Sequence, residues 1–391
     1  MDSAETMFPK KRAISKVAQN ILKKRYYHTG ENSWEDIANR VIEWVIPDAP
    51  QDRKEITRQM IINTYFIPNS PCLVNSGKPD GGLSACVPEY TRIPTDMGLL
   101  PISDVVNNKI GAWVFDGTNK VRIIGRKNSG IKRVIRITTE RGHVLDLTED
   151  HRVLVYNNKN KNSISKWKTV SELKNGDVLE FSNMGSDFPA NDFDKNLAIF
   201  IGYLYTDGCF TRDGRNGSRI LDIIVNSKHE AELLSKINIL ITGEDNLNIM
   251  YNDKYIRLRG YGTSRYSLLE KYEPFFSGIC RVPNDIYESN KESIGAFLSA
   301  VFSADGYVSV TKTGAIIGLA MSNEMFIRDV GKLLEYYGIR YSIHKSVDKR
   351  SDYKRLDSYV ITITDKFSQK LFLDNINFIN PQKSEKLELY L

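Results

Sequence analysis

The most constraining feature of this 391-residue sequence is an internal repeat in its second half. The first copy reads FIGYLYTDG at residues 200–208, and the second reads LSAVFSADG at residues 298–306. Each copy predicts an apolar helix of about two turns that ends in an Asp-Gly pair. Strand-like sequence and a further helix follow each copy, with the helices expected at 231–240 and 326–339. The segment 190–391 is therefore predicted to be a tandem duplication of an α+β unit.

The repeat places chemistry at the ends of its two helices. A small residue stands five positions before each aspartate, Gly202 before Asp207 and Ala300 before Asp305. Small residues at matching positions let two helices approach closely, so the two carboxylates are expected to meet. Neighbouring carboxylates stay ionised cheaply only with a cation between them. The pair predicts a Mg²⁺ site suited to phosphodiester hydrolysis; in the alternative interpretation both Asp-Gly pairs are simple helix stops.

These motifs resemble the paired signature of the LAGLIDADG homing endonucleases over residues 197–385. The resemblance implies that the two helices form a domain interface and that Asp207 and Asp305 bind the catalytic metal. It also implies antiparallel sheets that lie in the major groove of double-stranded DNA. The stretches 251–266 and 344–355 interleave Lys and Arg with Tyr. They are predicted to be strands with one basic face, which either tracks phosphates or is merely solvated.

The segment from residue 86 to about 185 has the period of short strands and predicts an all-β module. Arg141 and Gly142 stand where a hairpin needs positive φ. We therefore expect residues 134–139 to pair with residues 144–147.

Cys86 is a candidate nucleophile at the start of this module. A thiol beside its own upstream peptide bond can attack that carbonyl, here of Ala85, and convert the amide into a thioester. Thr148 and His151, three residues apart, are candidates for holding the amide and protonating the departing nitrogen. By itself the T-x-x-H pattern is weak, because an exposed turn histidine is its commoner explanation.

Several motifs together resemble the splicing (Hint) domain of an intein over residues 86–181. They are the leading Cys86, the G-x5-T-x-x-H pattern of Gly142, Thr148 and His151, and the stretch WKTVSELKNGD. The resemblance implies an N-terminal splicing segment at 86–189, followed by an inserted endonuclease. The His-Asn pair expected at the end of an intein does not occur in the sequence. We therefore expect an incomplete splicing fold, either truncated or completed by a separate C-terminal intein chain.

Residues 1–85 have a different, helical character. Apolar residues recur at helical spacing in 13–27 and 31–46, with a cap expected at Asn32 or Ser33. The following FIPNSPCLVNSG is predicted to be loop, with Cys72 as a loop thiol. Together with GGLSAC, this stretch resembles adenosylcobalamin-dependent ribonucleotide reductases. The resemblance implies a host (extein) fragment; adenosylcobalamin is expected only for the complete spliced host enzyme, and reductase activity is not expected from this chain alone.

Composition excludes several other classes. Four scattered cysteines do not form a disulfide scaffold or a zinc motif, and no apolar stretch reaches the roughly 20 residues of a membrane span. We expect a cytoplasmic protein without a membrane partner, and the net charge of +6 permits a polyanionic one.

The sequence thus predicts a multidomain intein-containing precursor fragment. Its expected activities are splicing that begins at Cys86 and Mg²⁺-dependent, site-specific cleavage of double-stranded DNA. The first alternative is a degenerate or truncated element that binds DNA without cleaving or splicing. The second is a ribonucleotide reductase fragment only.

Overall fold

The computed structural model describes most of the chain, namely residues 14–77, 86–115, 117, 119–123, 125–126, 128–156, 165–181, 191–212, 217–262, 266–272, 280–312, 314–347 and 357–391. The chain divides into two compact units that alternate along the sequence. Unit 1 comprises Met1–Pro88, Ser129–Ile137 and Asp146–Glu180. Unit 2 comprises Glu89–Asn128, Thr138–Leu145 and Phe181–Leu391.

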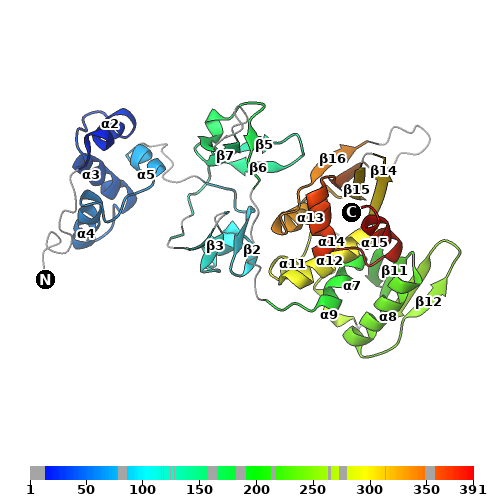
Figure 1. Cartoon of the computed structure of the whole chain (residues 1–391). Helices are drawn as coiled ribbons and strands as arrows, with labels where there is room; N and C mark the ends of the chain where they lie inside the picture. The colour runs from blue at the N-terminus through cyan, green and yellow to red at the C-terminus, as the bar shows by residue number, and fades with distance from the viewer. Residues whose placement is uncertain are drawn as a thin grey trace. The chain divides into compact units, whose positions relative to one another are not determined.

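The described part of unit 1 begins with four helices (Figure 1). They are α2 (Lys16–Arg25), α3 (Trp34–Val45), α4 (Gln51–Ile62) and α5 (Ser70–Asn75). The two amphipathic helices expected from the sequence are confirmed as α2 and α3. Ser33 caps α3 through a capping box with Asp36, because each side chain bonds a backbone N–H of the other residue. Trp34 and Ile37 bury the inner face of α3 in a small apolar core.

Helix α5 corrects the sequence analysis, which predicted loop throughout FIPNSPCLVNSG. Asn69 accepts a hydrogen bond from the Cys72 backbone N–H at 3.0 Å and so caps the helix, and a proline stands in its first turn. The same Pro, Asn and Ser residues that suggested a loop are therefore helix-start signals. Cys72 lies on this helix, with Sγ 3.7 Å from the hydroxyl of Ser76.

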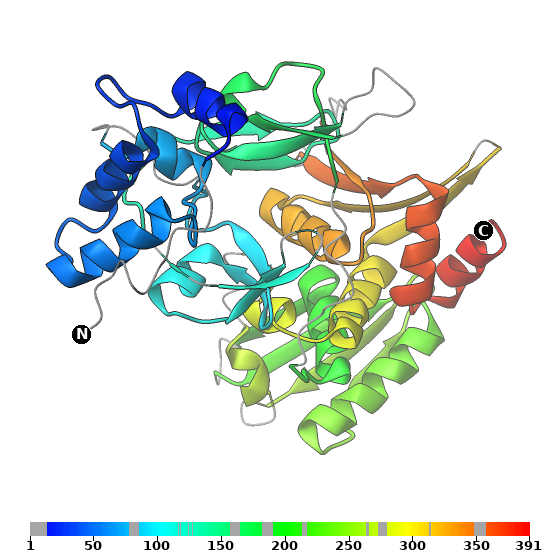
Figure 2. The same ribbon diagram turned by 60° about the vertical axis from the view of Figure 1, so that its left-hand side comes forward.

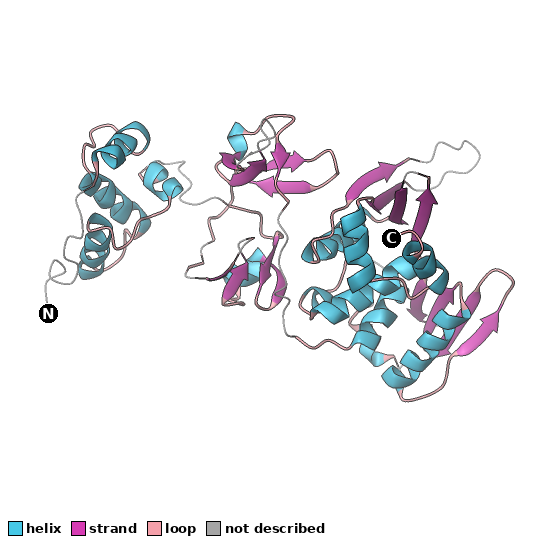
Figure 3. Cartoon of the chain, viewed as in Figure 1, coloured by secondary structure: helices cyan, strands magenta, loops and turns pink. Residues whose placement is uncertain are grey.

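The remaining described elements that lie wholly or partly in unit 1 are short strands, coloured magenta in Figure 3, and one 3₁₀ turn. They are β5 (Ile135–Thr138), β6 (Val144–Leu147), β7 (Arg152–Tyr156), β8 (Lys166–Thr169) and β9 (Val178–Leu179), with a 3₁₀ turn at Val170–Glu172. The expected β5–β6 hairpin is confirmed, and Gly142 supplies the positive φ of +82°. Strands β8, β7 and β9 form a separate antiparallel sheet.

The tip of the β5–β6 hairpin belongs to unit 2. The backbone N–H of Ile343 donates to the Arg141 carbonyl at 2.8 Å, and Arg328 donates to the Gly142 carbonyl at 3.0 Å. A side chain at Gly142 would place its Cβ 2.1 Å from the Ile343 carbonyl oxygen. Glycine is thus required here both by φ and by close backbone contact.

Unit 2 begins with a four-stranded antiparallel sheet of order β2-β1-β3-β4. Its elements are β1 (Arg92–Thr95), β2 (Gly98–Pro101), α6 (Ile102–Asn107), β3 (Trp113–Phe115) and β4 (Lys120–Arg122). Helix α6 shows that the all-β prediction for residues 86–185 was wrong at this point. Pro101 has the extended conformation of a helix N-cap, and Val105 buries the inner face of the helix.

The rest of unit 2 consists of two α+β repeats. The first contains α7 (Lys195–Thr206), β10 (Gly208–Arg212), β11 (Arg219–Val225), α8 (Lys228–Thr242), β12 (Asn248–Tyr251), β13 (Ile256–Tyr261) and α9 (Ser267–Glu270). The second contains α11 (Asn284–Tyr287), α12 (Lys291–Ala304), β14 (Gly306–Thr311), β15 (Gly314–Met321), α13 (Glu324–Tyr336), β16 (Ser342–Ser346), β17 (Ser358–Ile363), α14 (Lys366–Asn375) and α15 (Pro381–Glu388). Their sheets have the matching orders β10-β11-β13-β12 and β14-β15-β17-β16, in agreement with the predicted duplication.

Helices α7 and α12 lie side by side at the centre of the two repeats, and Figure 2 shows α8 along the first repeat's sheet. Both central helices are longer than the two turns predicted, because Asp194 and Asn290 cap them at earlier residues. The large apolar core of unit 2 surrounds this pair. No helix among the described residues is long and apolar enough to cross a membrane.

Candidate active site

The central helices approach each other at the small residues that the repeat predicted. A Cβ added to Gly202 would lie 2.6 Å from the Cβ of Ala300 and 2.8 Å from the Phe297 carbonyl oxygen. Real side-chain contacts are not this short, so only glycine permits this helix spacing. The close approach brings the C-terminal ends of α7 and α12 together.

The Asp-Gly pairs mark these two ends. Asp207 and Asp305 are the C-caps of α7 and α12, and each donates its backbone N–H back into its helix. A Cβ at Gly208 would lie 2.4 Å from the Cα of Leu204. At Gly306 it would lie 2.4 Å from the Phe302 carbonyl oxygen. Each glycine thus lets the chain turn sharply from helix into strand, with its aspartate at the junction.

The two carboxylates influence each other electrostatically. Burial, the nearby Asp305 charge and Glu230 raise the pKa of Asp207 to about 6. Burial also raises the pKa of Asp305, and Lys383 opposes this rise. The structure therefore brings Asp207 and Asp305 together, as the sequence analysis expected, in a place where negative charge is poorly solvated.

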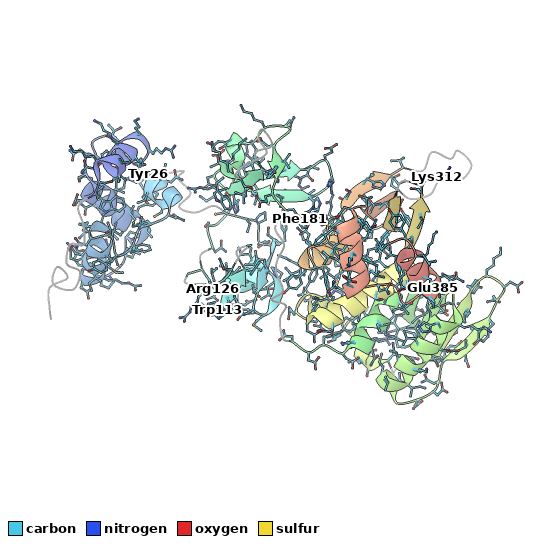
Figure 4. The ribbon with its side chains drawn as sticks, in the orientation of Figure 1. Tyr26, Trp113, Arg126, Phe181, Lys312 and Glu385 are labelled. Carbon is cyan, nitrogen blue, oxygen red and sulfur yellow. The ribbon has the colours of Figure 1, made fainter. Side chains whose placement is uncertain are left out.

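Lys383 is a site residue that the sequence analysis did not identify. It lies on α15, marked by the label Glu385 in Figure 4, and its ammonium donates to the carbonyl oxygens of Ser303 and Ala304 at the end of α12. Burial lowers the pKa of Lys383, whereas the carboxylates of Glu230, Asp207 and Asp305 oppose that change. A lone lysine about eighty residues after the second motif gives no sequence signal of this placement.

A buried hydrogen-bond network fixes α15 beside the site. The Glu230 carboxylate is 1% exposed and accepts hydrogen bonds from the Tyr203 hydroxyl at 2.8 Å and from the Asn380 amide at 2.9 Å. The Ser303 hydroxyl accepts the backbone N–H of Ile379 at 2.6 Å. The network joins α7 and α8 of the first repeat to α12 and α15 of the second.

The donor set fits a divalent cation that completes its coordination with ligands from outside the chain. Among the described residues no cluster of three or more His, Cys, Asp or Glu side chains could hold a metal ion. Asp207 and Asp305 offer hard carboxylate oxygens, which suit Mg²⁺, Mn²⁺ or Ca²⁺. A cation between them would offset the unfavourable negative charge that raises the pKa of Asp207.

The three candidate splicing residues also lie together, in unit 1. The Cys86 backbone N–H donates to Thr148 Oγ1 at 3.0 Å. The Cys86 carbonyl accepts the backbone N–H of Thr148 at 3.2 Å, and His151 Nδ1 lies 3.2 Å from the same carbonyl oxygen. The threonine contacts the amide nitrogen as expected. The histidine contacts the following carbonyl instead of the departing nitrogen, and Ala85 lies outside the described residues.

Burial lowers the pKa of His151, although the Cys86 carbonyl and Asp150 oppose this change. The lowered pKa favours the neutral form of the imidazole. Neutral imidazole has one N–H, and its contact with the carbonyl oxygen assigns that proton to Nδ1. His151 Nε2 is then a lone-pair acceptor.

The first repeat's sheet has the expected basic face. Arg257 and Arg259 alternate with buried residues along β13, within the predicted stretch 251–266. The second predicted stretch, 344–355, is described only at residues 344–347, and the rest lies outside the described residues.

Comparison with known families supports part of this organisation. A family model described as a LAGLIDADG-like domain matches residues 292–377, from α12 through α14. The second repeat is therefore similar to a LAGLIDADG-like domain, in line with the resemblance found in the sequence.

Two curated proteins match much longer stretches of the chain. The replication factor C small subunit of Methanocaldococcus jannaschii is 26% identical over 349 residues, which cover 81% of this chain and 17% of that protein. The ribonucleoside-diphosphate reductase NrdEB subunit alpha of Bacillus subtilis is 23% identical over 327 residues, which cover 74% of this chain and 29% of that protein. The chain thus spans less than a third of either relative.

Among solved structures, the homing endonuclease I-DmoI in complex with DNA and Ca is similar to half of the chain. The match has 18% sequence identity and a TM-score of 0.37, and it covers 50% of this chain and 98% of that one.

Proposed function

We propose that the two repeats form a homing endonuclease that cleaves double-stranded DNA at a specific site. The observation that carries the proposal is the pair of half-buried aspartates at the ends of α7 and α12, where burial and mutual repulsion raise the pKa of Asp207 to about 6. Burying two neighbouring carboxylates lowers the stability of the folded protein, so such a pair indicates a functional site. The pair suits a site that binds a cation and polarises a phosphodiester.

Asp207 and Asp305 would hold the metal, for which Mg²⁺ is the candidate, and the bound ion would supply Lewis-acid activation of the phosphate. Lys383 places a positive charge beside both carboxylates. Its backbone contacts at the end of α12 fix the ammonium, so that it stabilises negative charge on the reacting phosphate without reorganisation. The paired sheets present open faces that would contact the duplex.

The test separates cleavage from binding. The natural candidate substrate is the host gene without the insertion, carried on a plasmid with Mg²⁺. We expect wild-type protein to cut both strands and Asp207→Asn or Asp305→Asn to bind the same DNA with a loss of cleavage of about 10²-fold or more. Asp374→Asn, outside the site on α14, is the charge-matched control. Binding without cleavage by the wild type would instead establish the degenerate DNA-binding alternative.

We propose a second activity for unit 1, protein splicing that begins at Cys86. The supporting observation is the convergence of Thr148 and His151 on the backbone of Cys86 from more than sixty residues away. In the first step Cys86 Sγ would attack the carbonyl carbon of Ala85. A C–S bond forms, the C–N bond breaks, and the thiol proton passes to the freed amino group. Thr148 Oγ1 is placed to hold that nitrogen.

Release by thiol tests this step. Added dithiothreitol should liberate the fragment that ends at Ala85, detected by mass spectrometry, and Thr148→Ala should slow release by about 10²-fold. Cys209→Ala controls for removal of a thiol elsewhere, whereas Cys86→Ala should abolish release. Absence of release by the wild type, even after addition of a separate C-terminal intein chain, would refute the splicing proposal.

The helices of residues 16–75 would then belong to the host, a ribonucleotide reductase whose adenosylcobalamin chemistry requires the complete spliced enzyme. The similarity to the reductase subunit of Bacillus subtilis supports this assignment. The alternative of a reductase fragment with an inert insertion predicts nucleotide binding by this chain. Isothermal titration with ribonucleotides and deoxynucleotides discriminates the two, and we expect no binding.

A further inference from the structure

The open face of the first repeat's sheet carries a three-residue ionic cluster. Along β13 the side chains of Arg257 and Arg259 alternate with the buried Ile256 and Leu258, so both arginines share the face away from the core. Asp222 on the neighbouring β11 lies on the same face and pairs directly opposite Arg259. The cluster is therefore a feature of the sheet surface and not of the core.

Both arginines bond the same carboxylate. Arg257 Nε donates to Asp222 Oδ1 at 2.7 Å, and Arg259 Nε donates to Asp222 Oδ2 at 3.1 Å. Each also donates a terminal guanidinium N–H to Oδ2. The aspartate side chain is 13% exposed, whereas those of Arg257 and Arg259 are 36% and 29% exposed. The guanidinium groups of both arginines are thus more exposed to solvent than the Asp222 carboxylate that they bond.

The second repeat lacks this cluster at the equivalent positions. Strand register identifies the equivalent positions. In the first sheet Gly208 pairs with Ile223, and Ile223 pairs with Leu258. In the second sheet Gly306 pairs with Leu319, and Leu319 pairs with Ile361. Asp222 and Arg259 therefore correspond to Gly318 and Thr362, and Arg257 corresponds to the apolar Val360.

A tyrosine fills the place of the carboxylate in the second sheet. Tyr307 pairs opposite Gly318, and a Cβ at that glycine would lie 2.2 Å from the tyrosine ring. Tyr307 corresponds in register to Cys209 of the first repeat, which opposes Asp222. The two sheets share a topology but present different chemical groups on their open faces.

We infer that Arg257 and Arg259 read guanines in one half of an asymmetric DNA target and that Asp222 is the positioning residue that holds both guanidinium groups for this task. The inference rests on the proposed DNA-binding function and specifies its substrate. A planar guanidinium donates two parallel hydrogen bonds to O6 and N7 of guanine in the major groove, which no other base accepts in the same way.

The spacing of the two arginines sets the spacing of the bases. Residues two apart on a strand lie about 6.6–6.8 Å from each other. Bases along one DNA strand are separated by about 3.4 Å, so this distance corresponds to two base-pair steps. The expected motif in one half-site is therefore G-N-G, or two guanines at this separation on opposite strands, and it is absent from the other half-site.

Charge and mobility explain the role of Asp222. One carboxylate against two guanidinium groups leaves an excess positive charge, which favours the negatively charged groove. A bonded arginine has already lost much of its side-chain freedom, so less conformational entropy is lost when it meets a base. Without Asp222 the arginines keep their charge and still attract phosphates, but they lose the orientation needed to select a base.

The experiment is selection of bound duplexes from a randomised DNA library with the full chain in Ca²⁺, followed by sequencing. Wild-type protein should select two guanines two steps apart in one half-site. Arg257→Lys and Arg259→Lys keep the positive charge but remove the planar guanidinium group that donates two parallel hydrogen bonds. Each should reduce the preference for one guanine by about tenfold. Asp222→Asn should weaken both preferences while affinity for non-specific DNA is retained or increased.

Lys345→Ala is the matched control, because Lys345 is an ion-paired surface cation on the second sheet, 2.6 Å from Asp357. It should lower affinity without changing base preference. Thermal unfolding of each variant identifies loss of fold. Two outcomes would overturn this inference without affecting the proposed function. In one, the wild type selects a DNA motif without guanines. In the other, both lysine variants keep the guanine preference of the wild type. Failure of the wild type to bind DNA at all would overturn the proposed function.

Discussion

At the scale of single residues, the position of both candidate active-site aspartates depends on neighbouring residues that have no side chain or only a methyl group. Gly202 and Ala300 set the distance between α7 and α12, whereas Gly208 and Gly306 let the chain leave each helix at its aspartate. Since the steric contacts are with backbone atoms or with the facing helix, larger residues have no free space into which to move.

Gly202→Ala tests this argument. Its new Cβ would lie 2.6 Å from the Ala300 Cβ, so the helices must separate, and we expect a loss of about 1–3 kcal/mol in the free energy of unfolding. Urea denaturation followed by circular dichroism measures this loss. Gly125→Ala, where a Cβ meets no atom within 4 Å, should change it by less than about 0.5 kcal/mol. Equal effects of the two substitutions would contradict the close-packing argument.

The raised pKa of Asp207 makes stability depend on pH. Its pKa of about 6 in the folded protein exceeds the ordinary aspartate pKa of 3.8, so between pH 4 and pH 6 the folded state holds a proton that the unfolded chain has released. The contribution of Asp207 to the free energy of unfolding therefore falls as pH rises through this window.

Thermal unfolding of wild type and Asp207→Asn between pH 4 and 7.5 isolates this contribution. The stability of the variant relative to wild type should increase as pH rises to about 6 and then level off. At pH 7 added Mg²⁺ should raise the melting temperature of wild type, and EDTA should reverse the increase, with little effect on the variant. If the difference in thermal stability between wild type and Asp207→Asn does not vary with pH, the pKa of Asp207 is not raised.

At the scale of elements, α15 completes the site from the end of the second repeat. Asn380 caps this helix and bonds Glu230 of α8, and Lys383 bonds the last carbonyls of α12. The matched family segment, residues 292–377, ends before this helix. The position of Lys383 thus results from a helix cap and a buried carboxylate in another repeat.

Lys383→Met is expected to slow DNA cleavage by about 10²-fold while leaving DNA affinity within a few-fold, because it removes a fixed positive charge beside the reacting phosphate. Single-turnover cleavage and a gel-shift assay measure the two quantities. Lys386→Met, on the exposed face of the same helix, is the matched control and should cleave normally. Equal losses in both variants would mean that the charge of α15 acts only at long range.

At the scale of the whole molecule, the compact units do not follow the linear order of the sequence. The tip of the β5–β6 hairpin, residues 138–145, belongs to unit 2. The flanking residues 129–137 and 146–180 belong to unit 1. His143 lies there with its ring centroid 4.6 Å from that of Tyr341, and its Nε2 is 3.1 Å from the Tyr341 carbonyl. Local strand period predicts the hairpin, but nothing local indicates which unit receives its tip.

The sequence alone determined what local and periodic patterns encode. The repeat predicted two helices with small contact residues and terminal aspartates, the hairpin followed from Gly142, and the cap of α3 from Ser33. The helix α5 was missed because its proline and asparagine serve equally well in loops and at helix starts.

Only the tertiary structure decided which distant groups meet. Lys383 and Glu230 join the aspartates through the packing of α15 and α8, and Asp222 meets Arg257 and Arg259 through strand register. Sequence periodicity gives the face on which a side chain lies, since it depends on local backbone geometry. The partner across that face depends on long-range packing, and it is this packing that assembles the charges of the candidate site.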